Sequence, residues 1–301
     1  MTENSQINVH KAGFVTIVGK PNVGKSTLMN ALVGERLSII TSKAQTTRHR
    51  IMGVISGDDF QIVYSDTPGI IKPKYDLHES MMTFVNYSLS DADVILFITD
   101  IYEKYDEDDV IQKLQKTDTP ILLLINKVDQ VKEQKDVEDK IAYWTECFPQ
   151  AKKILPISAL EKFNIDQVFN FILEEIPEHP AYYPKDQLTD KPERFFVSEI
   201  IREKILQNYK KEIPYACEVE IEEFKEEEKI IRIRSVIYVE RSSQKGIIIG
   251  HQGNAIKKVG TESRLEMEKF FQKKVFLEQY VKVESDWRKK ERSLKRFGYK
   301  K

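Results

Sequence analysis

The segment Gly19-Lys20-Pro21-Asn22-Val23-Gly24-Lys25-Ser26 stands directly after a short apolar run, residues 14–18, and opens an amphipathic run, residues 25–33. It matches the pattern G-x-x-x-x-G-K-[ST] in the strand, loop and helix context that this pattern requires. In such a loop the backbone N–H groups and the helix N-terminus surround a phosphate, which the aligned peptide dipoles favour. The segment therefore predicts a P-loop nucleotide site in which Lys25 reaches the β/γ oxygens and the Ser26 hydroxyl ligates Mg²⁺.

Short β-branched apolar runs alternate with longer amphipathic runs between residues 13 and 176. This order predicts an α/β domain with a mostly parallel sheet. We expect strands over residues 14–18, 51–55, 60–64, 94–99, 121–125 and 154–157. We expect helices over residues 25–33, 80–90, 106–116, 136–148 and 165–176, with Asn164 as the N-cap of the last. Gly57-Asp58-Asp59 forms a hairpin turn, so the second and third strands make an antiparallel edge.

Three further motifs follow strands of this domain. In Asp66-Thr67-Pro68-Gly69 the carboxylate can hold Mg²⁺ through water, and the Gly69 N–H can approach a γ-phosphate. Asn126-Lys127-Val128-Asp129 and Ser158-Ala159-Leu160 follow two later strands, at the carboxyl ends where open α/β sheets bind ligands. Asp129 can accept from both N1–H and the 2-amino group of guanine, whereas adenine offers neither donor. With the Lys127 stem over the ring and the Ala159 N–H on O6, the motifs predict a guanine nucleotide and exclude ATP.

With all four motifs in order, the first 176 residues resemble the translation-factor-related GTPases. GTPases of this kind carry a loop that senses the γ-phosphate between the first helix and the second strand, and here that interval contains Gln45-Thr46-Thr47-Arg48-His49-Arg50. We expect Thr47 to ligate Mg²⁺, with Thr46 as the alternative. Residues 36–50 would become ordered with GTP and loosen after hydrolysis. Ile70 occupies the position at which Ras-like GTPases carry a water-orienting Gln, which predicts slow intrinsic hydrolysis. In related members the Asn that corresponds to Asn22 can ligate K⁺, so K⁺ is a candidate cofactor.

Prolines at 177, 180, 184 and 192 mark a semi-rigid linker and hence a domain boundary. We divide the chain into an extension over 1–12, a GTPase domain over 13–176, a linker over 177–193 and a second domain over 194–301. Residues 1–194 hold 22 basic and 30 acidic side chains, net −8, and residues 195–301 hold 25 and 18, net +7. Residues 229–301 hold 20 basic and 8 acidic side chains, net +12, ending in a basic tail. Such asymmetry indicates a polyanionic partner.

The second domain is expected to be α+β, with a helix over 197–209, strands over 216–224 and 230–239, two short helices around Gly250–Gly253, a strand over 275–283 and a final basic helix. Gly250-His251-Gln252-Gly253 between the two helices resembles the Gly-x-x-Gly loop of a KH domain, and the element order is that of the type II form. That loop clamps the backbone of about four single-stranded nucleotides. The RNA-binding residues so implied are Lys245, Gly250, His251, Gln252, Gly253, Lys257 and Lys258.

A GTPase followed by a KH domain resembles the Era family over essentially the full length of the chain. The resemblance implies a cytoplasmic GTP hydrolase that uses Mg²⁺, binds the 3′ end of small-subunit ribosomal RNA and assists assembly of the small ribosomal subunit. It also implies a weak peripheral association with the inner face of the membrane, and a GTP-dependent shift of the KH domain through the linker. The catalytic residues it implies are Lys25, Thr47, Asn22 and Gly69, and the Mg²⁺ ligands are Ser26, Thr47 and Asp66. The implied GTP-binding residues are Gly19, Lys20, Pro21, Asn22, Val23, Gly24, Lys25, Ser26, Thr27, Asp66, Thr67, Pro68, Gly69, Ile70, Asn126, Lys127, Val128, Asp129, Ser158 and Ala159.

The composition excludes several other classes. The chain is 41% hydrophobic and 32% charged, with no uncharged apolar stretch long enough for a membrane span. Its two cysteines cannot form a disulfide framework, and its histidines show no metal-ligand spacing, so we expect no structural metal site. Two rivals stay open: another ribosome-associated or tRNA-modification GTPase of the same subgroup, and an RNA-binding structural protein that the nucleotide only stabilises.

Overall fold

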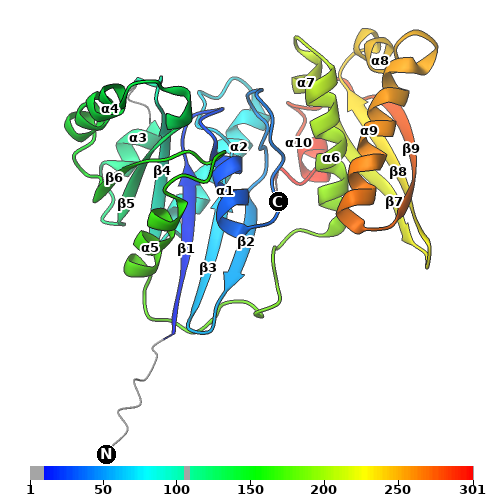
Figure 1. Ribbon diagram of the computed structural model, residues 1–301. Coiled ribbons are helices and arrows are strands. Elements are labelled where there is room, and N and C mark those ends of the chain that lie inside the picture. The colour runs from blue at the N-terminus through cyan, green and yellow to red at the C-terminus, as the bar shows by residue number, and fades with distance from the viewer. Residues whose placement is uncertain (1–9, 105–108, 301) are drawn as a thin grey trace, which may run out of the picture. The chain divides into compact units, whose positions relative to one another are not determined.

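The structure is a computed structural model that describes residues 10–104 and 109–300. The chain forms two compact units (Figure 1). The first comprises residues up to 38, 47–71 and 82–190, and the second comprises 39–46, 72–81 and the residues from 191 onward. Two short segments of the N-terminal half therefore belong to the C-terminal unit.

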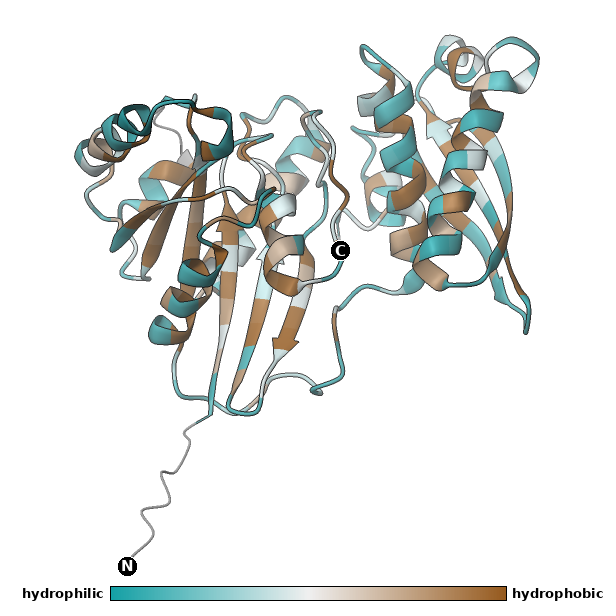
Figure 2. Cartoon of the chain, viewed as in Figure 1, coloured by the Kyte–Doolittle hydropathy of each residue, from teal (hydrophilic) through white to brown (hydrophobic). Residues whose placement is uncertain are grey.

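The first unit is built on a six-stranded sheet with the order β2-β3-β1-β4-β5-β6. Its strands are β1 Lys11–Val18, β2 Ile51–Ser56, β3 Phe60–Asp66, β4 Val94–Asp100, β5 Ile121–Asn126 and β6 Lys153–Pro156. Neighbouring strands run parallel except β2 and β3, which are antiparallel. The strands at the centre are almost continuously apolar (Figure 2), as expected where helices cover both faces of a parallel sheet. The predicted α/β fold and its antiparallel edge are confirmed.

The register of the strands brings the sequence motifs to one edge of this sheet. Ile17 pairs with Asp66 and Asp100 pairs with Asn126, so the loops after β1, β3, β4 and β5 leave the sheet side by side. The helices that alternate with the strands are α1 Lys25–Val33, α2 Asp76–Ser90, α3 Asp109–Leu114, α4 Gln134–Cys147 and α5 Ile165–Glu175, with a 3₁₀ turn η1 over Val128–Gln130.

Several helix boundaries differ from the expectation, most clearly those of α2 and α3. α2 begins at Asp76 and not at residue 80, and part of the helix expected over 106–116 lies outside the described residues. Asn164 holds the N-cap position of α5, but its φ is 60° and its side chain does not cap the helix. Its Nδ2 instead donates to the Pro156 carbonyl at 2.8 Å, so a local backbone turn replaces the expected cap.

The second unit has the element order of a type II KH domain. It comprises α6 Glu193–Asn208, α7 Ile213–Ala216, β7 Glu218–Glu226, β8 Ile230–Val239, α8 Ser242–Ile249, η2 His251–Gly253, α9 Asn254–Phe271, β9 Lys274–Val283 and α10 Glu291–Arg296. β8 lies between an antiparallel β7 and a parallel β9, and α6 and α9 pack on one face of this sheet. The predicted α+β fold is confirmed. The helix after Gly253 is 18 residues long, so the expectation of a short helix there is wrong.

The basic C-terminal segment is part of the core of the second unit. Trp287 is fully buried, and its Nε1 donates to the Ala216 carbonyl at 2.9 Å. Tyr299 is 3% exposed and donates to Glu218 at 2.6 Å. Arg296 pairs with Glu220, so this basic side chain is neutralised within the fold.

Residues 177–190, where the linker was expected, belong to the first unit and contact its strands. Glu178 bridges to Lys11 and Thr189 bridges to Gly53, both antiparallel. The Gln61 amide donates to the Tyr183 carbonyl at 2.8 Å. Among the described helices, none is long and apolar enough to cross a bilayer.

Candidate nucleotide and RNA sites

The loop between β1 and α1 folds tightly because two of its positions need glycine. At Gly19 an added Cβ would lie 2.1 Å from the Ile98 carbonyl oxygen. Gly24 has φ 105°, and a Cβ there would lie 2.2 Å from the Asn126 amide. Asn22 also adopts a positive φ, 67°. The resulting concave loop ends at the N-terminus of α1, where free backbone N–H groups favour an anion.

Lys25 lies across this loop and is buried. Its Nζ donates to the carbonyls of Gly19 at 3.1 Å and Lys20 at 2.8 Å. Burial lowers the pKa of Lys25 to about 8, while the nearby carboxylates of Asp66 and Glu103 act in the opposite direction. A buried ammonium group beside a loop that can surround a phosphate interacts strongly with a polyanionic ligand.

The three expected Mg²⁺ ligands come together beside Lys25. Ser26 Oγ lies 2.8 Å from Thr47 Oγ1 and donates to Asp66 Oδ2 at 2.8 Å, and Thr47 Oγ1 donates to the same oxygen at 3.3 Å. Adjacent oxygens around an octahedral Mg²⁺ with bonds of 2.0–2.1 Å are about 2.9 Å apart. Asp66 Oδ1 is buried and makes no hydrogen bond to another described residue. The oxygen set and this unmatched carboxylate oxygen therefore fit the ion.

The Asp66 carboxyl is held in a dry environment. Burial raises its pKa, and the Ser26 hydrogen bond and the Lys25 charge oppose that rise. A divalent cation at this point would hold the carboxylate in its ionised form.

Thr46 and Thr47 point to different partners, which distinguishes the two candidates. The Thr46 hydroxyl donates to the Lys43 carbonyl at 2.6 Å and lies 2.7 Å from Thr41 Oγ1. Only Thr47 of this pair contacts Ser26 and Asp66.

Gly69 and Ile70 lie close to the phosphate loop. A Cβ on Gly69 would lie 2.9 Å from Pro21 Cα, and the Ile70 N–H donates to the Gly19 carbonyl at 3.0 Å. Ile70 is 6% exposed and has no polar side-chain atom with which to orient a water. The Thr67 hydroxyl donates to the Ile17 carbonyl at 2.7 Å and is structural.

The base-recognition motifs form one connected network. Asn126 Nδ2 donates to the Val23 carbonyl at 2.7 Å, and its Oδ1 accepts from the Ala159 N–H at 2.9 Å. Ser158 Oγ donates to Asp129 Oδ1 at 2.5 Å. The network orients the Asp129 carboxylate at the carboxyl edge of the sheet. The Ala159 N–H, expected on guanine O6, is here engaged by Asn126.

Two acidic residues at the end of β4 were not found from the sequence. Asp100 Oδ2 pairs with Lys127 Nζ at 2.8 Å, and Glu103 pairs with Lys20 at 3.4 Å. Burial raises the pKa of Glu103. Both positions follow a predicted strand at its carboxyl end, and that position is the signal that could have found them.

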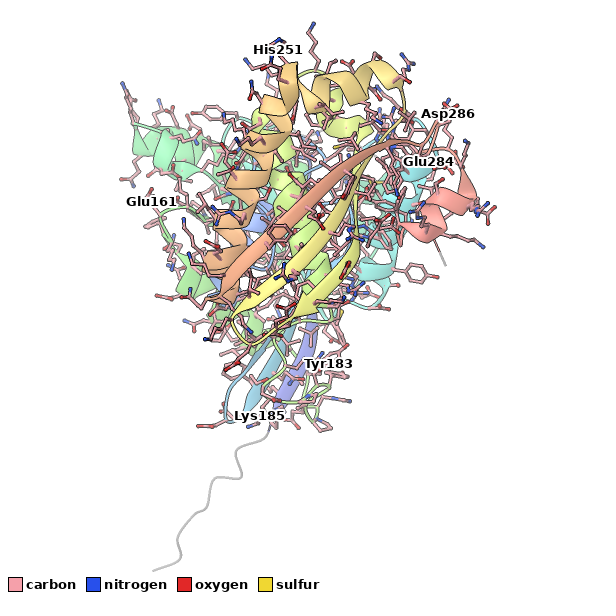
Figure 3. All side chains as sticks on the ribbon, turned by 90° about the vertical axis from the view of Figure 1, so that its right-hand side faces the viewer. Glu161, Tyr183, Lys185, His251, Glu284 and Asp286 are labelled. Carbon is pink, nitrogen blue, oxygen red and sulfur yellow. The ribbon has the colours of Figure 1, made fainter. Side chains whose placement is uncertain are left out.

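The Gly250–Gly253 loop forms an exposed turn between α8 and α9. Gly250 and Gly253 have φ values of 71° and 77°, and a Cβ on Gly253 would meet no atom within 4 Å. Figure 3 shows His251 at the tip of this loop, and its side chain is exposed. The Tyr209 hydroxyl donates to the Ile248 carbonyl at 2.6 Å and fixes the end of α8 to the core.

The basic side chains near this loop differ in their partners. Lys258 pairs with Glu262 at 3.8 Å. Lys245 and Lys257 form no ion pair with any residue in the described part of the chain. A backbone-binding loop flanked by uncompensated lysines is suited to phosphates.

Comparisons with known proteins identify both units. Residues 14–127 match the family described as "50S ribosome-binding GTPase", and residues 212–288 match the family described as "KH domain". The chain is 44% identical over 293 residues to GTPase Era of Staphylococcus epidermidis, covering 96% of this chain and 97% of that protein. It is 45% identical over 294 residues to GTPase Era of Alkaliphilus metalliredigens, covering 96% and 99%.

Two solved structures are similar over nearly the whole chain. One is Era in complex with MgGDPNP and nucleotides 1506–1542 of 16S ribosomal RNA, with a TM-score of 0.92, 39% identity, and coverage of 97% of this chain and 100% of that one. The other is an Aquifex aeolicus Era variant bound to GDP and aluminium fluoride, with a TM-score of 0.91, 38% identity and the same coverage.

Proposed function

The chain belongs to the Era family of GTPases, and we propose that it binds the 3′ end of small-subunit ribosomal RNA through its KH unit and assists assembly of the small ribosomal subunit. The family expected from the sequence is confirmed, and the chain is a GTPase. The observation that carries the RNA proposal is the similarity, over 97% of this chain and 100% of the other, to an Era structure that holds MgGDPNP and the 16S ribosomal RNA fragment. The exposed Gly250–Gly253 loop supplies the matching surface here.

The nucleotide site performs its chemistry mainly by positioning and electrostatics. The loop N–H groups and Lys25 hold the phosphates, and Asp129 selects guanine. Ser26, Thr47 and Asp66 would hold Mg²⁺, which supplies charge neutralisation at the β- and γ-phosphates. The Gly69 N–H would approach the γ-phosphate from the loop after β3.

Hydrolysis by this site is slow without help, because Ile70 cannot orient water. Asn22 is exposed on the phosphate loop in a left-handed conformation, where its amide oxygen is available to a monovalent cation. We propose that K⁺ binds there and stabilises charge that develops in the transition state. Equal turnover in K⁺ and Na⁺ would exclude this role.

The segment that leads to Thr47 supports a coupling between nucleotide state and the KH unit. Residues 39–46 belong to the second unit, and Arg202 of α6 donates to the carbonyls of Gln45, at 3.3 Å, and Thr46. The Ile40 N–H donates to Glu203 at 3.2 Å. Because Thr47 follows this segment directly, a change in its Mg²⁺ coordination acts on a segment that α6 holds. We therefore place the coupling in residues 39–46, in addition to the linker.

The cellular setting is part of the proposal. We propose that the chain acts on the small subunit in the cytoplasm and associates weakly with the inner face of the membrane. Lys289, Lys290 and Arg292 form no ion pair with another residue of the described chain and could contact anionic lipid. Co-flotation with phosphatidylserine vesicles, compared with neutral vesicles, tests the membrane part.

The test is steady-state GTP hydrolysis in K⁺ and Mg²⁺, with and without a short single-stranded RNA that copies the 3′ end of small-subunit ribosomal RNA. We expect the RNA to bind and to raise turnover. Turnover without RNA binding would overturn the RNA partner and leave the GTPase. RNA binding without turnover would favour a binding protein that the nucleotide only stabilises.

A further inference from the structure

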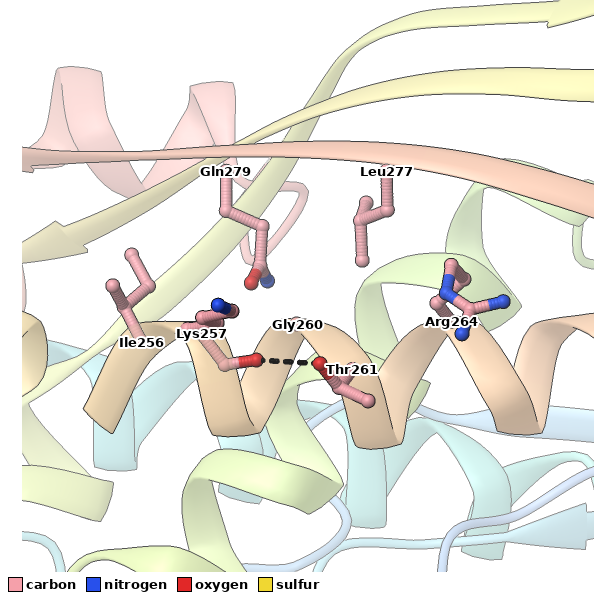
Figure 4. Close-up of a pocket in the computed structure, with 7 residues that line it drawn as sticks. All are labelled: Ile256, Lys257, Gly260, Thr261, Arg264, Leu277 and Gln279. Carbon is pink, nitrogen blue, oxygen red and sulfur yellow. Dashed lines mark hydrogen bonds between the residues drawn. The ribbon is translucent and has the colours of Figure 1, made fainter. Parts of the chain in front are cut away.

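A cavity adjoins each of the two sites. One of about 300 Å³ lies between α9 and β9 and is lined in part by Lys257, so it belongs to the proposed RNA site (Figure 4). Another, of about 850 Å³, lies beside the base-recognition motif and is lined in part by Tyr102 and Gln130. The turn that contains Tyr102 begins with Asp100, whose carboxylate pairs with Lys127 of that motif.

Asp100 is the last residue of β4, and its carboxylate is fixed by local and by sheet contacts. Its Oδ1 accepts from the backbone N–H groups of Tyr102 at 3.0 Å and Glu103 at 2.9 Å, which is the arrangement of an Asx turn. Asp100 also pairs in register with Asn126 of the parallel strand β5, and the Ile101 N–H donates to the Asn126 carbonyl at 3.1 Å. The sheet and the turn therefore set the position of this carboxylate relative to the base-recognition motif.

The second oxygen of the same carboxylate holds the end of the Lys127 side chain. Asp100 Oδ2 accepts from Lys127 Nζ at 2.8 Å, and the two side chains are 15% and 28% exposed. A hydrogen bond between two charged groups is stronger than a neutral one. The backbone of Lys127 is fixed as well, since it adopts the left-handed region, with φ 64°, directly before η1. Both ends of the Lys127 side chain are thus held.

Holding both ends matters because a lysine side chain has a flexible stem of four methylene groups. The stem is the part of Lys127 that is expected to cover the guanine ring. Restricting it before the nucleotide binds removes part of the entropy cost that binding would otherwise carry.

We infer that Asp100 is a positioning residue for guanine recognition, which holds the Lys127 ammonium so that the stem is in place before the nucleotide arrives. The inference rests on the nucleotide site of the proposed function, with Lys127 over the ring. Asp100 itself makes no contact with the base. It acts on the affinity for the nucleotide through Lys127.

The variant Asp100→Asn isolates this role, because an amide keeps the shape of the carboxylate. Its oxygen can still accept from the N–H groups of Tyr102 and Glu103, so the turn is retained, while its NH₂ group cannot accept from Lys127. Stopped-flow fluorescence of the full chain in Mg²⁺, with GDP that carries a methylanthraniloyl group, gives the association and dissociation rates. We expect Asp100→Asn to raise the Kd about tenfold, mainly through faster dissociation.

A double-mutant cycle tests whether the effect passes through Lys127. Lys127→Ala removes the stem and should itself raise the Kd about tenfold or more. In the Lys127→Ala background, Asp100→Asn should change the Kd less than about twofold, because no ammonium remains to be held. An effect of Asp100→Asn that is equal in both backgrounds, or absent in the unmodified one, would overturn the inference alone. An unchanged Kd in Lys127→Ala would overturn the role of Lys127 and the inference with it.

Steady-state kinetics distinguishes positioning from a structural role. The guanine ring does not react, so contact with it stabilises the ground state and the transition state equally. Because hydrolysis is slow, KM follows the Kd of GTP, and Asp100→Asn should raise KM about tenfold while kcat changes less than about twofold. A fall in kcat together with a lower thermal midpoint of the nucleotide-free chain would assign Asp100 a structural role and overturn the inference.

Glu175→Gln is the matched control. Glu175 pairs with Lys152 at 2.6 Å, and its side chain is 14% exposed, close to the value for Asp100. Lys152 stands directly before β6, at the amino ends of the strands, whereas the base-recognition motif lies at the carboxyl ends. Glu175→Gln should therefore leave both the Kd of GDP and the KM of GTP unchanged. A rise in Kd that matches the rise in Asp100→Asn would make the effect a general result of charge loss and would overturn the inference.

Discussion

Arg202 of α6 gives the sharpest test of how the second unit holds residues 39–46. Its side chain is 1% exposed, and it pairs with Glu199 through Nε at 2.7 Å and Nη2 at 2.6 Å. The same guanidinium donates to the carbonyls of Gln45 and Thr46. In Arg202→Met the Glu199 carboxylate would remain buried without its cation. Removing one partner of a buried ion pair costs about 3–5 kcal/mol.

A second variant separates this electrostatic cost from the anchoring of the loop. Glu199→Gln combined with Arg202→Met removes the orphan charge, so most of the lost stability should return, to within about 1–2 kcal/mol of the unmodified chain. The two carbonyls would still lack their donor. Residues 39–46 should therefore exchange their amide hydrogens faster in both variants, while the loss of stability should be large only in the single variant.

The chain offers a convenient assay, because its two tryptophans lie in different units. In a Trp144→Phe background, denaturant unfolding followed by Trp287 fluorescence reports on the second unit. Arg234→Met is the control, since its exposed pairs with Glu223 and Glu278 are expected to contribute less than about 1 kcal/mol. A cost below about 1 kcal/mol for Arg202→Met, or unchanged exchange of residues 39–46, would refute the reasoning.

Three further predictions concern the two sites. Thr47→Ala should raise the Mg²⁺ concentration needed for half-maximal GTP turnover at least tenfold, whereas Thr46→Ala should change it less than about threefold; a Mg²⁺ titration that reverses this order would assign the ligand to Thr46. Asp129→Asn should weaken GTP binding at least a hundredfold and strengthen binding of xanthosine triphosphate, because the amide donates where the carboxylate accepted; calorimetry that shows no change in base preference would contradict the assignment. Lys25→Ala should abolish GTP binding and leave RNA binding, and Gly253→Asp should do the reverse, so reciprocal loss of both activities in either variant would refute two separable sites.

Local sequence patterns were sufficient to predict the architecture of the first unit and the positions of the nucleotide-site motifs in it. The alternation of apolar strands and amphipathic helices predicted a mostly parallel sheet with an antiparallel edge, and the structure has both. The motifs at residues 19–26, 66–69 and 126–129 each lie at the end of a strand, so the parallel register alone brings them together.

Positions without a motif could not be found in this way. Glu103 lies at the phosphate loop only because β4 ends beside that loop, where the Glu103 side chain pairs with Lys20. The Lys20–Glu103 pair leaves no spacing in the sequence, because its two partners are more than 80 positions apart.

The sequence by itself identified the candidate segments for phosphate, guanine and RNA recognition, because each is a short segment whose backbone conformation is set locally by glycines and strand ends. The tertiary structure decided how those segments are held. It showed that Thr47 contacts Ser26 and Asp66 whereas Thr46 contacts Lys43, placed residues 39–46 and 72–81 in the second unit, and buried Trp287 and Tyr299 within the basic C-terminal segment. The last two outcomes depend on packing, hydrogen bonds and ion pairs between residues more than 50 positions apart, such as Arg202 with the Thr46 carbonyl and Arg296 with Glu220. Such contacts are selected by the whole fold, so only the folded chain could reveal them.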